Sequence, residues 1–169
     1  CPSCAGNLDL FHAMGIDRVM FCGGGGVLDN TIGVGQLLLV EGSIRDEGFS
    51  YHYLPPERFV DTSQRIRSVL ADTLAGHALT CCPCITWTTD GFYRETAGMI
   101  AHRREEGCTV VEMECASLAA CAAFRGADFA QLLYTADSLA DASHYDARDW
   151  GEKSVLPALY LCLDAAAKL

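Results

Sequence analysis

The chain has 169 residues, half of them hydrophobic, and a formal net charge of −10. This length suffices for one domain with a buried core, and the acidic balance argues against nucleic acid or an anionic membrane as a partner, because both require clustered Lys and Arg. No apolar run approaches the roughly 20 residues of a membrane span, and the chain opens without the basic start of a signal peptide. We therefore expect one cytoplasmic domain over residues 1–169 that binds neither nucleic acid nor membrane.

Apolar runs alternate with segments of helical periodicity along the chain. Residues 46–58 contain paired prolines and predict a loop, and we expect Arg45 and Asp46, where the preceding strand gives way to it, to be solvated. Strands alternating with helices predict a doubly wound α/β sheet. The expected strands are 18–22, 36–44, 78–86, 110–111 and 129–134, and the expected helices are 7–14, 62–75, 96–106, 114–124 and 154–169.

Ten cysteines are many for this length, and most lie inside apolar runs, where a reduced cysteine behaves as a small buried hydrophobe. The spacing of Cys1 and Cys4 matches half of a zinc site, but Cys82-Pro83-Cys84 is not a usual second half. We therefore expect reduced structural thiols and no metal.

Two carboxylates flank a methionine in Glu112-Met113-Glu114, where the strand ending at Val111 passes into a helix rich in small residues. In an open α/β sheet, ligands bind at the carboxyl ends of the strands. The alternative is that both glutamates only complement the dipole of the helix that follows. Position alone does not separate a binding site from this structural role.

Three loop segments are further candidates for binding. Gly23-Gly24-Gly25-Gly26 predicts a turn after a buried strand; the backbone there could approach an anion, although a plain tight turn is the simpler interpretation. Phe92 and Tyr93 could stack on a planar base, and as isolated residues they are better interpreted as core residues beneath a loop. Asp137 ends an apolar strand and could act as a general acid or cap a turn.

In combination, these segments resemble the nucleoside phosphorylase family, which contains purine nucleoside and uridine phosphorylases and related nucleosidases. The resemblance covers essentially the whole chain, and Glu-Met-Glu before a small-residue helix is its most specific motif. The matching segments are Cys1-Pro2-Ser3, Gly23–Gly26, Gly33-Val34-Gly35-Gln36, Asp46–Tyr53, Thr89–Tyr93, Val111–Glu114 and Thr135-Ala136-Asp137. The resemblance implies a three-layer α/β sandwich around a mostly parallel or mixed central sheet.

The resemblance also implies a role for each matching residue. Met113 and Glu114 would hold the ribose, with the Glu114 carboxylate accepting hydrogen bonds from the 2′- and 3′-hydroxyls. The base would stack on Phe92 beside Tyr93 and Val111, and Asp137 would protonate a purine nitrogen as the base departs. The last site residues, Gly23 and Gly24, occupy the position of the family's phosphate loop.

The implied reaction is cleavage of the N-glycosidic bond of a purine or uridine-like nucleoside, with inorganic phosphate as co-substrate and no cofactor. A homo-oligomer, from dimer to hexamer, is also implied. Two positions depart from the phosphorylase pattern: Phe21 replaces an arginine, and Gly24 replaces Ser or Thr, so two phosphate donors are absent. The family's N-terminal strands are also absent from this sequence. A nucleosidase that uses water and a non-catalytic nucleoside-binding relative therefore remain as alternatives.

Overall fold

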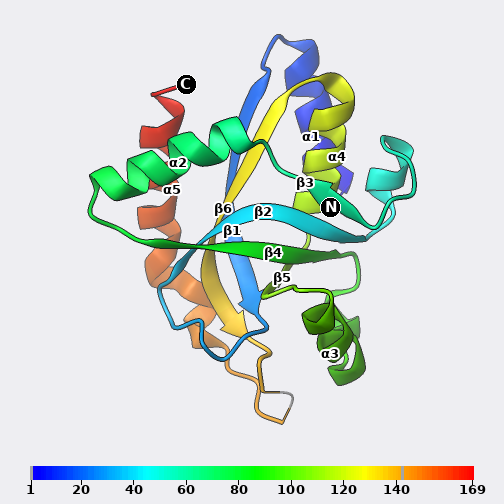
Figure 1. Ribbon diagram of the computed structural model, residues 1–169, viewed down its shortest axis with the longest axis vertical. Helices are drawn as coiled ribbons and strands as arrows, with labels where there is room; N and C mark the ends of the chain where they lie inside the picture. Colours follow the sequence, from blue (N-terminus) through cyan, green and yellow to red (C-terminus); the bar gives the residue numbers. More distant parts are fainter. Residues whose placement is uncertain (1, 142) are drawn as a thin grey trace.

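The computed structural model describes residues 2–141 and 143–169 (Figure 1). Three short 3-10 helices, η1 (Phe49–His52), η2 (Phe92–Arg94) and η3 (Arg148–Gly151), lie in the connections. The helices are α1 (Pro2–Ala13), α2 (Gln64–Gly76), α3 (Ala97–Glu105), α4 (Cys115–Arg125) and α5 (Glu152–Ala166). The strands are β1 (Arg18–Val27), β2 (Leu37–Asp46), β3 (Phe59–Asp61), β4 (Cys81–Thr89), β5 (Val110–Glu112) and β6 (Asp128–Ser138).

The six strands form one mixed sheet in the order β3-β2-β4-β5-β1-β6, and β6 also pairs with β2. The last pairing is antiparallel and runs from Leu37 opposite Tyr134 to Val40 opposite Gln131. It closes the sheet on itself, and Figure 1 shows β2 and β4 running across β1 and β6. The expected α/β class with a mixed central sheet flanked by helices is confirmed. The sheet is closed, however, and differs in this from the open doubly wound sheet that the alternation of elements predicted.

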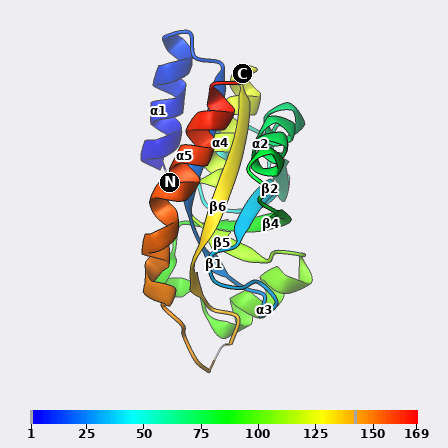
Figure 2. The same ribbon diagram turned by 90° about the vertical axis from the view of Figure 1, so that its left-hand side faces the viewer.

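Helices cover the sheet on two sides: α1 packs with α4, and α2 packs with α5. Figure 1 shows the first pair to the right of β1 and β6 and the second pair to their left, and Figure 2 views the molecule from the side of α2 and α5. Successive residues of β6 serve these two layers, because side chains alternate between the faces of a strand. Leu133 belongs to the core beneath α1 and α4, whereas Leu132 belongs to the core beneath α2 and α5. Because both faces of β6 are buried, its sequence is a nearly continuous apolar run. A third cluster, around Trp87 and Ile100, lies beneath α3.

The four consecutive glycines form part of β1, so the predicted turn at Gly23–Gly26 is wrong. All four pair with β6, and none has a positive φ. Glycine is required here for close approach: a Cβ on Gly25 would lie 2.5 Å from Cγ2 of Val110, and one on Gly26 would lie 2.7 Å from Cδ1 of Leu139. Side chains on these residues would push β5 and the segment after β6 away from β1.

The segment that opens the predicted solvated loop is buried, so this expectation is also wrong. Arg45 is 1% exposed, and its guanidinium donates to Oγ of Ser50 at 2.9 Å and to the carbonyl of Pro55 at 2.6 Å. Asp46 accepts from the indole nitrogen of Trp87 at 2.9 Å. Prolines lack a backbone N–H and cannot extend the sheet. Arg45 holds the proline-rich loop against the sheet instead, because one guanidinium can donate hydrogen bonds to several carbonyl groups.

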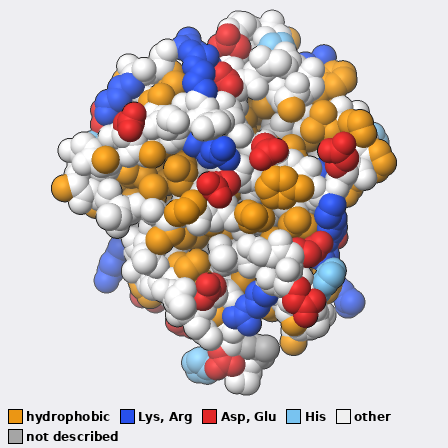
Figure 3. All heavy atoms as spheres, in the orientation of Figure 1, with side chains coloured by type: hydrophobic (Ala, Val, Ile, Leu, Met, Phe, Trp, Pro, Cys, Tyr) orange, Lys and Arg blue, Asp and Glu red, His pale blue; other side chains and the backbone are white. Residues whose placement is uncertain are grey.

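Acidic and basic side chains are interspersed on the face drawn in Figure 3. The ion pairs of the structure include Arg58 with Glu106 at 2.8 Å and Arg103 with Asp46 at 2.7 Å. Within the described residues, no helix is both long and apolar enough to cross a bilayer.

The close packing at β1 makes a testable prediction for stability. Gly25→Ala should lower the free energy of unfolding by about 1–3 kcal/mol, because the new methyl group overlaps buried Val110. The matched control is Gly6→Ala on the exposed side of α1, where nothing lies within 4 Å of the new Cβ. This control should raise stability by about 0.5–1 kcal/mol. Urea denaturation measures the free energy of unfolding of both variants. Equal changes in the two variants would contradict the role of close packing at Gly25.

Candidate active site

A cleft opens where β1, β5 and β6 end, and three adjoining hollows make it up. The hollow nearest β5 has a volume of about 300 Å³ and is called here the central cleft. A second hollow of about 440 Å³ shares Phe92, Asp137 and Trp150 with it, and a third of about 220 Å³ extends toward α3. The central cleft is lined by Gly24, Gly26, Phe92, Glu95, Val111, Glu112, Met113, Glu114, Tyr134, Ala136, Asp137, Leu139 and Trp150.

Most of the residues singled out in the sequence meet at this cleft. The central cleft contains Gly24 of β1, Val111 of β5 and Asp137 of β6, and the second hollow contains Tyr93. Phe92, Met113 and Glu114 complete the group in the central cleft. Gly23 is not among the lining residues; its Cβ position faces the ring of Phe21 and the side chain of Leu133. The closed sheet therefore brings together residues that are more than 100 positions apart in the sequence.

Glu112 holds the start of α4 in place. Its Oε2 accepts the backbone N–H groups of Glu114 and Cys115, both at 2.7 Å. Its Oε1 accepts the hydroxyl of Thr88 at 2.5 Å, and the amide of Gln131 reaches Oε2 at 3.3 Å. Burial raises the pKa of this carboxyl, and the hydrogen bonds favour its charged form. Glu112 thus has the structural role of a helix N-terminal acceptor.

Glu114 has a different role, although it is only two residues away. It is the N-cap residue of α4, but its side chain makes no cap hydrogen bond. Instead it lines the central cleft beside Met113, and burial raises the pKa of its carboxyl. The two explanations of the Glu-Met-Glu motif therefore each apply to one glutamate. Glu112 complements the helix, and Glu114 is available to a ligand.

Asp137 lies inside β6 opposite Gly26, so it is not the cap of a helix. Its side chain is buried, and its Oδ2 accepts the hydroxyl of Tyr145 at 3.0 Å. A Cβ on Gly26 would lie 3.0 Å from Oδ1, so glycine leaves room for this carboxyl. Burial raises the pKa of Asp137, while Tyr145 and the charge of Arg148 oppose the rise. A carboxyl of this kind can retain its proton at a higher pH and serve as an acid.

The aromatic residues form an exposed rim around the cleft. The exposed fractions of Phe92 and Tyr93 are 40% and 93%, so the interpretation as core residues beneath a loop is wrong. The Phe92 and Trp150 ring centroids lie 6.4 Å apart, and those of Tyr145 and Trp150 lie 6.3 Å apart. Trp150 has a φ of 53°, an unfavourable backbone conformation for a large residue that here accompanies its position at the rim. The flat faces can accept a planar heterocycle.

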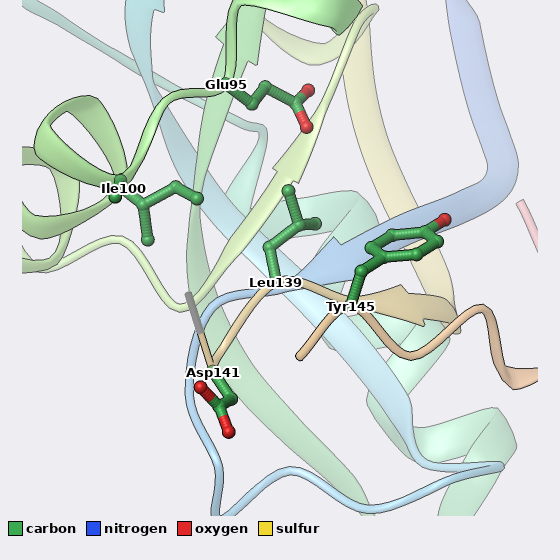
Figure 4. Close-up of a pocket in the computed structure, with 6 residues that line it drawn as sticks. Glu95, Ile100, Leu139, Asp141 and Tyr145 are labelled. Carbon is green, nitrogen blue, oxygen red and sulfur yellow. The ribbon is translucent and has the colours of Figure 1, made fainter. Parts of the chain in front are cut away.

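Sequence reasoning missed Glu95, Tyr145 and Trp150. Glu95 lines all three hollows, and Figure 4 shows it on the segment before α3, opposite Leu139 and Tyr145 from the segment after β6. Burial and the neighbouring charge of Asp137 raise the pKa of Glu95 to about 7. Arg94-Glu95-Thr96 follows the matching segment Thr89–Tyr93, but nothing in the pattern gives Glu95 a role, so only the tertiary structure reveals it.

The cleft is strongly acidic. Four carboxyl groups line the central cleft, those of Glu95, Glu112, Glu114 and Asp137, and the described lining of all three hollows contains no Lys or Arg. Elsewhere, too, no cluster of three or more His, Cys, Asp or Glu side chains among the described residues has the arrangement of a metal site. The arrangement suits a neutral, polar ligand with hydroxyl and N–H donors, because ionised carboxylates only accept hydrogen bonds.

The comparisons with known proteins agree with this fold. Residues 1–166 match the family model of the phosphorylase superfamily, and the chain therefore belongs to that superfamily. A solved AMP nucleosidase from Bacteroides thetaiotaomicron superposes with a TM-score of 0.79 at 22% identity, covering 96% of this chain and 65% of that one. The P. knowlesi homologue of P. falciparum PNP gives a TM-score of 0.81 at 16% identity, covering 98% of this chain and 69% of that one. This chain thus spans about two thirds of the length of either structure.

The different roles of the two glutamates predict different effects on stability. Glu112→Ala should lower the free energy of unfolding by about 3 kcal/mol, because it leaves buried donors at the start of α4 without an acceptor. Glu114→Ala should change stability by less than about 1 kcal/mol. Chemical denaturation of both variants gives the comparison. Similar losses in the two variants would contradict the assignment of Glu112 as the structural residue.

Proposed function

We propose that this protein cleaves the N-glycosidic bond of a purine nucleoside and transfers the ribosyl group to phosphate, which yields the free base and ribose 1-phosphate. Membership in the phosphorylase superfamily supports reaction chemistry of this general kind. The observation that carries the proposal is the meeting of Glu114, Phe92 and Asp137 in one cleft. They supply an acceptor for sugar hydroxyls, a flat apolar face and an acid, which are the three groups that a nucleoside substrate requires.

The sugar binds at the end of the cleft formed by Met113 and Glu114. The Glu114 carboxylate accepts hydrogen bonds from the 2′- and 3′-hydroxyls. Its position depends on Glu112, whose carboxylate accepts the backbone N–H of Glu114 at 2.7 Å. Glu114 therefore acts on the ligand, and Glu112 is a positioning residue.

The base lies across Phe92 with Asp137 at its edge. As the bond between C1′ and the base nitrogen breaks, the electron pair moves to the base and the sugar develops positive charge. Protonated Asp137 donates its proton to a ring nitrogen of the purine, and the cleft carboxylates stabilise the cationic sugar electrostatically. Phosphate then forms the new bond to C1′. The raised pKa of Asp137 supports this role, because the acid must hold its proton until the base departs.

Hydrolysis is a second candidate, and the charge of the cleft favours it. The described lining residues include four carboxyl groups at the central cleft and no basic side chain, so a phosphate anion is repelled there. Phe21 stands where phosphorylases place an arginine, and its ring lies 3.1 Å from the Cβ position of Gly23. Water needs no cation to bind. The AMP nucleosidase among the structural neighbours shares the fold at 22% identity.

A panel of nucleosides assayed with and without phosphate tests the proposal. Release of base from inosine or adenosine only when phosphate is present, with ribose 1-phosphate as the second product, supports phosphorolysis. Equal rates without phosphate, with free ribose as product, establish hydrolysis instead. Binding of nucleosides without turnover indicates a non-catalytic relative, and failure to bind any nucleoside overturns the proposal.

Asp137→Asn should slow cleavage of purine nucleosides by about 100-fold or more, because the amide has no proton to donate at a useful pKa. KM should change by less than about threefold if the ribose contacts persist. In the parent protein, kcat should fall as the pH rises through the raised pKa of Asp137, since the acid is active only when protonated. Steady-state rates from pH 5 to 9 measure both effects. A variant that retains the parental rate and pH profile would remove Asp137 from the reaction.

Glu114→Gln should weaken binding of the sugar, because the neutral amide oxygen is a poorer acceptor than a carboxylate. We expect KM to rise by about tenfold for ribonucleosides and by less for 2′-deoxyribonucleosides, which lack one of the two hydroxyls. Equal effects on the two substrate classes would contradict the contact with the 2′-hydroxyl.

A further inference from the structure

Glu95 is a half-buried carboxyl group without a protein partner. No described residue donates a hydrogen bond to its side chain, although it lies at the junction of all three hollows. Asp137, by contrast, receives the hydroxyl of Tyr145, and Glu112 receives two backbone N–H groups. Solvent in the open cleft can hydrate this carboxyl group, so a ligand that displaces that water must supply the donor that replaces it.

The surroundings of Glu95 define the kind of donor that fits. Phe92 and Trp150 share the central cleft and the second hollow with it, so a planar ring that stacks there presents its edge to the carboxyl. Leu139 and Ile100 provide apolar walls in the third hollow, and Figure 4 shows them beside Glu95. The titratable groups that share these hollows with Glu95 are carboxyl groups and tyrosine hydroxyls, namely Glu112, Glu114, Asp137, Asp141, Tyr93, Tyr134 and Tyr145. None of these is a cation, so the missing partner is an N–H group of the ligand.

We propose that Glu95 recognises the base, accepting a hydrogen bond from an N–H group on the purine edge that faces away from the sugar, while Asp137 contacts a different nitrogen. This inference rests on the proposed function and specifies its substrate class. The class comprises 6-oxopurine nucleosides, which carry a ring N–H on that edge, and 6-aminopurine nucleosides, which carry an exocyclic amino group. Purine riboside, which has neither group, is disfavoured.

The test compares three substrates in the parent chain and in Glu95→Ala: inosine, adenosine and purine riboside. For each substrate, kcat/KM of the variant is divided by that of the parent, which cancels the intrinsic reactivity of the base. We expect the ratio to fall by about 10–100-fold for inosine, adenosine or both, since a hydrogen bond to a charged group contributes about 1.5–3 kcal/mol. For purine riboside the ratio should stay within about threefold of one. The substrate with the larger loss identifies the donor as a ring N–H or an amino group.

Two further variants separate recognition from folding. Glu95→Gln keeps an acceptor oxygen and should recover part of the kcat/KM that Glu95→Ala loses. If Glu95 were only structural, the loss of kcat/KM would be the same for all three substrates. Glu105→Ala on α3 is the matched control, because its side chain is 80% exposed and lies outside the lining of the cleft. It should leave all three ratios near one. Equal losses for the three substrates, or no loss for any of them, would overturn the assignment of Glu95.

Binding of free bases distinguishes failure of this inference from failure of the proposed function. If the parent chain cleaves no nucleoside, the proposed reaction is wrong, and the affinities of hypoxanthine, adenine and unsubstituted purine are measured by calorimetry on the same variants. A loss of affinity in Glu95→Ala that is confined to hypoxanthine or adenine supports the role of Glu95 in a binding protein. If the parent binds none of the bases, or if all three affinities fall equally, the inference is overturned.

Discussion

The carboxylate of Glu112 connects three elements of the structure through hydrogen bonds. It accepts hydrogen bonds from the start of α4, from Thr88 of β4 and from Gln131 of β6. It has almost no contact with solvent, and these donors, together with the positive end of the α4 dipole, are what offset the cost of burying its charge. Because the same contacts fix the backbone at Met113 and Glu114, the geometry of the cleft depends on this one buried group.

The cleft next to this group concentrates carboxyl groups in different environments. Glu112 is satisfied by the protein, Asp137 has one protein donor, and Glu95 has none among the described residues. These hydrogen-bond partners distinguish the groups by function. A carboxyl group that already accepts several protein donors is structural, and one without protein donors is available to a ligand. Burial raises the pKa of Asp137 and of Glu95, so each can hold a proton at a pH where an exposed carboxyl would be ionised.

Closure of the sheet explains several differences between the expected and the observed elements. The glycines of β1 were interpreted as a turn, but they extend the strand and allow β5 and the segment after β6 to pack against it. The third expected strand ended at residue 86, whereas β4 continues to Thr89 and Trp87 is fully buried beneath α3. Arg45 was expected in solvent, and it is buried because the carbonyl groups of a folded loop surround it. The first two differences depend on partners distant in the sequence, which local patterns do not report. The burial of Arg45 depends on the folded shape of a loop only 10 to 12 residues away.

The sequence by itself determined the α/β class and the positions of most helices and strands, because hydrophobic periodicity and strand-to-helix junctions are local properties. The motif resemblance likewise identified Glu114, Phe92 and Asp137 as candidates. Only the tertiary structure decided that the sheet closes, that Glu112 is structural while Glu114 faces the cleft, and that Glu95, Tyr145 and Trp150 join them. The physical reason is that burial and hydrogen-bond partners, which set the charge and availability of a carboxyl group, arise from contacts between segments far apart in the chain.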